Sequence, residues 1–189
     1  VPKIVKNTSA NVQANFLAPG SKVAIRNNLQ TVKMITDEPV FQDPVYMAVG
    51  LGITQPKESV STDIVGKTKL IVERTATAKK NADELKSQAF SIISEAFSHS
   101  SSRLGQVIDI SAITSDILSL EGVQSVYMTR TDAPTLKITG VSMLIWNPVY
   151  PISDIEIVNQ NIILPYFKYP YIFDSAGLLE LIEVTQALS

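Results

Sequence analysis

The chain has 189 residues and a mass of 20.6 kDa, which is enough for one or two domains, and 45% of its residues are hydrophobic. Its longest apolar runs are far shorter than the roughly 20 residues that span a membrane, and it contains no cysteine, which excludes disulfides, thiolate metal sites and cysteine nucleophiles. The net charge is only -2, so neither end is basic enough to act as a nucleic-acid-binding arm.

Residues 1–44 are interrupted by Pro19-Gly20, Pro39 and Pro44. This pattern predicts an N-terminal connecting segment with one short helix over residues 21–29. The chain begins with Val1 rather than Met, and no signal-peptide pattern follows. We therefore expect a fragment or a processed product without a signal peptide.

Two strands are predicted next. VYMAVGLGI at 45–53 is a nearly continuous apolar run, which is typical of a strand buried on both faces. TKLIVERTA at 68–76 alternates, with Leu70 and Val72 on one face and Lys69, Ile71 and Glu73 on the other.

A helix is expected to begin after Asn81. Asn81 and Glu84 have the spacing of a capping box, and Asp83 adds negative charge to the first turn, where the helix dipole favours it. Apolar residues then recur at helical spacing to about residue 98 and predict one stripe that packs on a sheet or another helix. These residues are Leu85, Ala89, Ile92, Ile93, Ala96 and Phe97.

The stretch DISAITSDILSLEGVQSVYMTRTD at 109–132 predicts a short helix followed at once by a strand. Either Asp109 or Ser111 can cap this helix. Its apolar side is formed by Ile110, Ile113, Ile117 and Leu120. Gly122 is the predicted structural turn, because glycine adopts the left-handed conformation without the penalty of roughly 1 to 2 kcal/mol that a Cβ brings.

In the strand that follows, Val126 and Met128 are expected to share one face.

The predicted fold class is α+β. Residues 45–132 are expected to form an α+β domain, a small sheet with helices packed on one face. Residues 133–189 are expected to form a β-rich aromatic C-terminal region, with strands over 136–146 and 178–185.

Few residues point to catalysis. His99 is the only histidine, and it lies in a serine-rich loop that is more simply interpreted as a solvated connector than as a Ser-His site. The acidic pairs Asp37-Glu38, Asp154/Glu156 and Glu180/Glu183 lack the spacing of a calcium loop. We predict no catalytic residue, no metal and no cofactor, although a carboxylate pair assembled from distant positions stays open as an alternative.

The most prominent feature of the C-terminal region is its aromatic content. In PYFKYPYIF at 165–173, alternate aromatic side chains would line one face of an extended chain, and they either close the core of this chain or form a subunit interface. The interface candidates are Trp146, Tyr150, Tyr166, Phe167, Tyr169, Tyr171 and Phe173.

The two ends of the chain differ in charge. Residues 1–36 carry five basic side chains and no acidic one, whereas residues 153–189 carry five acidic side chains against Lys168 alone. These charges could attract each other within a subunit or between subunits, or they could belong to solvated faces that happen to differ.

Short motifs in the central region resemble a known family. LGQ at 104–106 is followed by Ser111, Ile113, Ile117, Gly122-Val123 and Val126. This series, and the upstream MITDEPVFQDPVYMAVGLGI, resemble the baseplate J-like family of contractile phage tails, and within it the C-terminal portion of wedge proteins of the T4-like type. The resemblance covers about residues 30–132.

The resemblance implies a non-enzymatic structural protein of the phage tail baseplate wedge. Proteins of this family form dimers that join into a ring and link neighbouring wedges. The implied partners are further copies of the chain and other wedge proteins, without nucleic acid or membrane, and the implied location is the virion, with the host cytoplasm during assembly. The alternative is a hydrolase with dispersed carboxylates or a Ser/His site.

Overall fold

A computed structural model describes residues 19–30, 45–53, 68–98, 104, 106–146, 156–158, 161–164 and 168–187. The mixed arrangement of helices and strands confirms the predicted α+β class. The helices are α1 (Pro19–Gln30), α3 (Ala82–Ala96), α4 (Ile110–Leu118) and α5 (Ser175–Glu180). The strands are β1 (Val45–Leu51), β2 (Thr68–Arg74), β3 (Val107–Asp109), β4 (Val123–Arg130), β5 (Ala133–Thr139), β6 (Met143–Trp146), β7 (Glu156–Val158), β8 (Asn161–Ile163), β9 (Lys168–Ile172) and β10 (Ile182–Gln186).

The largest sheet has the strand order β10-β2-β4-β5. β2 runs antiparallel to β4 and parallel to β10. Leu70 and Val72 are fully buried on one face, as the alternation of the sequence predicts, and they lie level with Met128 and Val126 of β4. This face belongs to the main hydrophobic core.

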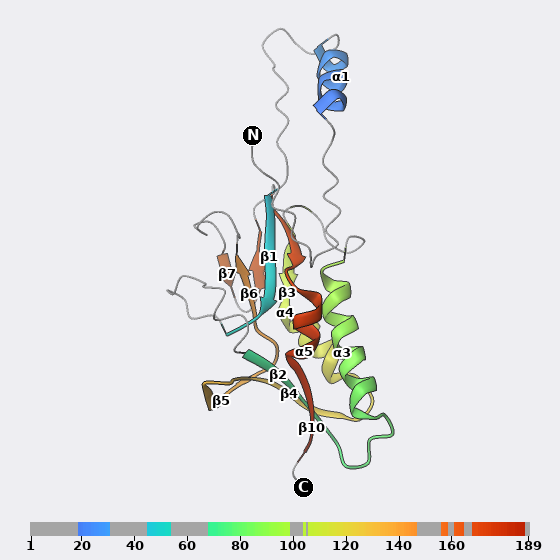
Figure 1. Ribbon diagram of the computed structural model, residues 1–189, viewed down its shortest axis with the longest axis vertical. Coiled ribbons are helices and arrows are strands. Elements are labelled where there is room, and N and C mark those ends of the chain that lie inside the picture. The colour runs from blue at the N-terminus through green and yellow to red at the C-terminus, as the bar shows by residue number, and fades with distance from the viewer. Residues whose placement is uncertain are drawn as a thin grey trace.

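The helices α3 and α4 cover that face, so the expected packing of helices on one side of a sheet is confirmed for this sheet. α4 packs against β4, and α3 packs against β10 and against α4 (Figure 1). The predicted capping box of α3 is present: the Glu84 N-H donates to Asn81 Oδ1 at 2.8 Å, and the Asn81 N-H donates to Glu84 Oε2 at 3.0 Å. Asp109, not Ser111, caps α4 by accepting from the Ala112 N-H at 3.0 Å.

A second sheet has the order β6-β1-β9, and β1 is its central strand. The predicted burial of this strand is confirmed, because every residue from Met47 to Leu51 is buried. Next to it, Gly52 approaches Leu144 so closely that a Cβ at residue 52 would overlap the leucine side chain. β1 was expected to share a sheet with residues 68–76; it pairs instead with β6 and β9.

The two larger sheets both combine strands from before and after residue 132. β2 and β4 pair with β10 and β5 in one sheet, and β1 pairs with β6 and β9 in the other. The sheets therefore do not separate along the expected division between residues 132 and 133. Among the described residues, the core likewise contains side chains from both stretches, such as Val72 and Ile182.

The predicted strand over 178–185 is only half correct. Residues 175–180 form α5, whose N-cap Asp174 accepts from the Gly177 N-H at 3.0 Å, and β10 begins at Ile182. In LLELIEVT, leucines and isoleucines at short intervals fit both helical and strand periods, so the cap at Asp174 was the deciding local signal.

The remaining described elements are the small sheet β3-β8-β7 and the helix α1. The helix predicted over 21–29 is confirmed as α1, which lies apart from the sheets, at the opposite end of the molecule from the C-terminus (Figure 1). Within the described part of the chain, no helix has the length and hydrophobicity needed to cross a membrane.

Candidate interface

Three tyrosines from strands that are far apart in sequence meet on the β6-β1-β9 sheet. β1 and β9 run parallel, with Tyr46 level with Tyr169 and Ala48 level with Tyr171. The Tyr46 ring lies 5.6 Å from the Tyr169 ring and 6.2 Å from the Tyr171 ring, centroid to centroid, and both contacts are edge-to-face. We call Tyr46, Tyr169 and Tyr171 the aromatic patch.

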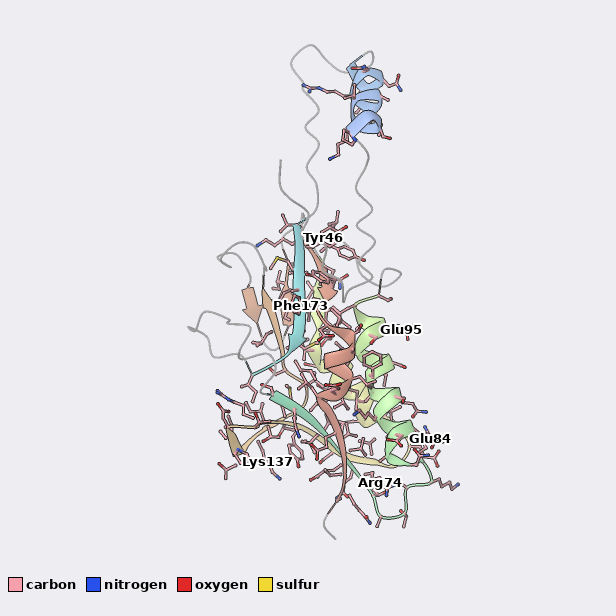
Figure 2. The ribbon with its side chains drawn as sticks, viewed as in Figure 1. Tyr46, Arg74, Glu84, Glu95, Lys137 and Phe173 are labelled. Atoms are coloured by element: carbon pink, nitrogen blue, oxygen red, sulfur yellow. The ribbon has the colours of Figure 1, made fainter. Side chains whose placement is uncertain are left out.

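The aromatic patch occupies the face of β1 and β9 that is turned away from the main core. Successive strand residues point to opposite faces, and the alternate residues Met47 and Val49 belong to the core. The small residue Ala48 is level with Tyr171 and leaves room for its ring. Tyr46 lies at the outer end of β1, beyond the helical layer (Figure 2).

The three tyrosines are half-buried. Their position is therefore intermediate between the two expectations of the sequence, a closed core and an open interface. Burial also raises the pKa of the Tyr171 phenol, because the phenolate would be desolvated. Side chains of this kind, rigid and amphipathic, contribute large contact areas at protein interfaces.

The other interface candidates are placed less fully. Phe173 follows β9 and is half-buried, and its N-H donates to the Val49 carbonyl of β1 at 3.1 Å. Trp146 ends β6, and its backbone pairs with Ala48. The side chain of Trp146, and the residues Tyr150, Tyr166 and Phe167, lie outside the described part of the chain.

Gly122 has a φ of +91°, the left-handed conformation expected of a structural turn. Its carbonyl accepts from the Thr75 N-H at 2.9 Å. A Cβ at this position would lie 2.6 Å from the Ala78 Cβ, so the turn that joins α4 to β4 is also tightly packed against the chain after β2. Both the conformation and the packing require glycine here.

The edges of the four-stranded sheet offer poor sites for another strand. β5 carries Pro134 and Lys137, and its pairing with β4 is irregular beside Arg130. The Lys137 ammonium lies over the Tyr127 ring, 4.5 Å from its centroid. At the opposite edge, β10 has only five residues. Proline, lysine, irregular pairing and shortness are among the means by which proteins protect sheet edges.

Several of the acidic side chains that the structure describes have structural contacts. Asp109 and Asp174 cap helices, and Glu183 forms an ion pair with Lys69 at 3.0 Å. Among the described residues, no three His, Cys, Asp or Glu side chains gather in a group that could hold a metal ion. His99, its neighbouring serines at 100–102 and the pair Asp37-Glu38 lie outside the described residues. Of the pair Asp154/Glu156, only the backbone of Glu156 is described.

Sequence comparison adds no relative from which a function could be transferred. No protein-family model matches the chain, and no curated protein is significantly similar to it.

Proposed function

We propose that this chain is a non-enzymatic assembly module that associates with further copies of itself through the aromatic patch, as a structural component of a contractile-phage baseplate wedge. The observation that carries the self-association is the half-buried cluster Tyr46, Tyr169 and Tyr171, held by paired strands. What supports the baseplate setting is the sequence resemblance within residues 30–132.

The backbone around the patch favours binding, because it is already ordered in one copy. β1 pairs with β9 along Tyr46 and Tyr169 and with β6 from Ala48 onward, so both tyrosines belong to paired strands of one sheet. Little conformational entropy is then lost when a partner covers the rings. One edge of the four-stranded sheet, β5, carries proline, lysine and irregular pairing, so the addition of another strand there is disfavoured.

The direct test is the molecular mass of the purified full chain in solution, measured by light scattering over a range of concentrations. We expect a dimer or a larger assembly, and we expect Tyr169→Asp and Tyr46→Asp to weaken association at least about tenfold, the loss of roughly 1.4 kcal/mol. Tyr127→Asp is the matched control, because Tyr127 is also a half-buried tyrosine on a sheet face but lies on the four-stranded sheet.

Two results would contradict self-association through the patch: a wild-type monomer at every concentration, or a Tyr169→Asp chain with unchanged mass. Circular dichroism of each variant separates lost association from lost folding. The hydrolase alternative would be supported by ester hydrolysis that disappears in His99→Ala.

The baseplate setting requires its own test. The purified chain should co-migrate with isolated wedge proteins of a contractile phage in native electrophoresis, and Tyr127→Asp should leave this unchanged. If the chain self-associates but does not co-migrate with wedge proteins, the proposed assembly role stands and the proposed baseplate setting is contradicted.

A further inference from the structure

The helix α1 has no described layer to pack against. Apart from the half-buried Lys22, every residue of α1 whose exposure is described is exposed, including Val23 at 57%, Leu29 at 41% and Ile25 at 37%. α1 has 12 residues, and isolated helices of fewer than about 12 to 15 residues are only marginally stable in water. A helix of this length gains stability when another surface covers its exposed apolar side chains.

The surface that best matches α1 lies at β3 and α4. Among the described residues, seven large hydrophobic side chains are exposed; three are on α1, three lie between residues 104 and 118, and the last is Leu136. In the second group, Val107 of β3 is 57% exposed and Leu118 of α4 is 42% exposed. Between them, the exposed side of α4 carries small side chains, which let another helix approach closely: Ser111, Ala112 and Ser115.

The charges of the two elements are complementary. α1 contains Lys22 and Arg26 and no acidic residue, whereas residues 104–118 contain Asp109 and Asp116 and no basic residue. Asp116 is exposed in the last turn of α4, where the negative end of the helix dipole disfavours a carboxylate. A guanidinium from another helix would relieve this repulsion.

We propose that α1 of one copy packs along the exposed side of α4 in a second copy, with Ile25 and Leu29 against Leu118 and Val107 and with Arg26 near Asp116. The lengths agree, because 12 and 9 helical residues extend about 18 Å and about 14 Å. The 14 residues 31–44 between α1 and β1 can span at most about 50 Å, enough for α1 to reach a neighbouring copy.

This contact rests on the self-association proposed above and adds a second surface to it. The aromatic patch is on the β6-β1-β9 sheet, whereas α4 lies on the four-stranded sheet. Two separate contacts on each copy allow assemblies larger than a dimer.

The first experiment compares apolar variants of the full chain by light scattering over a range of concentrations. Ile25→Asp on α1 and Leu118→Asp on α4 should each weaken association at least about tenfold. Leu136→Asp is the matched control, because Leu136 is 40% exposed on β5 and belongs to neither surface. Unchanged association in Ile25→Asp would overturn the proposal.

The second experiment tests the pairing and separates exchange between copies from docking within one copy. Arg26→Glu and Asp116→Arg should each weaken association, and the double variant should restore it. Mixing Ile25→Asp chains with Leu118→Asp chains should also restore association, because each copy supplies the surface that the other lacks. No rescue in the double variant would overturn the α4 docking site, and no rescue on mixing would overturn exchange between copies.

Repeating the Ile25→Asp measurement in a Tyr169→Asp chain distinguishes failure of this contact from failure of the aromatic patch. If association falls with Tyr169→Asp alone and Ile25→Asp adds nothing, the patch stands and the α1 contact is refuted. If only Ile25→Asp lowers association, the α1 contact stands and the patch is refuted.

Discussion

The four-stranded sheet and the β6-β1-β9 sheet differ in the side chains on the face that is turned away from the main core. On the four-stranded sheet, the face turned away from the helices is joined across strands by polar contacts: Lys69 with Glu183, Ser125 with Glu73, and Lys137 with the Tyr127 ring. On the other sheet, the corresponding face carries the half-buried aromatic patch. The first face is joined by polar contacts within one copy, whereas the second carries tyrosine rings that are only partly buried.

The largest effect is expected from the buried face of the four-stranded sheet. Leu70 is fully buried beneath the helical layer, so Leu70→Ala should lower the free energy of unfolding by about 2 to 5 kcal/mol. Chemical denaturation followed by circular dichroism measures this change. Leu70→Ala chains that are folded should associate as strongly as wild type. If they associate more weakly, the proposal that the four-stranded sheet plays no part in association is contradicted.

A smaller effect is expected at the turn that leads into this sheet. Gly122→Ala should destabilise the fold by about 1 to 2 kcal/mol or more, because φ is +91° and the new methyl group would meet Ala78. Gly20→Ala is the control: a Cβ there meets nothing within 4 Å, and alanine favours a helix by about 0.5 to 1 kcal/mol. Equal thermal stability of wild type and Gly122→Ala would contradict the argument.

The aromatic patch should give the fold a dependence on alkaline pH. Burial raises the folded-state pKa of Tyr171 above its ordinary value of 10.0, so above about pH 10 the unfolded chain binds fewer protons than the folded chain at this position. The contribution of Tyr171 to stability is present below pH 10 and is lost as the pH rises through its folded-state pKa. The free energy of unfolding of Tyr171→Phe should fall less steeply with pH above about pH 10 than that of wild type. Equal pH dependence in the two chains would count against burial of the phenol.

The smallest effect is expected on the polar face of the four-stranded sheet. The side chains of Lys69 and Glu183 are 41% and 48% exposed, so Glu183→Gln should cost no more than about 1 kcal/mol in unfolding free energy. The difference should shrink further in high salt because the pair is screened. A much larger loss of unfolding free energy, or any change in association, would contradict the view that the polar contacts on this face act only within one copy.

Much of the local structure followed from the sequence, but the single strand predicted over 136–146 is two strands, β5 and β6, with Gly140 at φ +85° between them. The capping pair Asn81 and Glu84, the apolar stripe of α3 and the glycine at 122 specify their conformations through contacts within a few residues. Residues 178–185 show the limit of this reasoning, because the same apolar spacing fits a helix and a strand, and α5 was missed. The α+β class was predictable from the order of these elements.

The candidate site could be predicted only in part. Alternation in the segment at 165–173 placed Tyr169 and Tyr171 on one side of a strand, but nothing in that segment indicated Tyr46. Tyr46 joins them because β1 and β9 pair in parallel, and this register depends on contacts between distant residues.

The sequence by itself determined the helices α3 and α4 and the strands β2 and β4, with the apolar side of each, because caps, turns and periodicity act over a few residues. Only the tertiary structure decided which strands are neighbours. It joined β1 with β9 and β2 with β10 across the expected division after residue 132. The physical reason is that backbone hydrogen bonding between strands is nearly the same for any sequence, so partners are selected by how whole apolar faces fit together in the core.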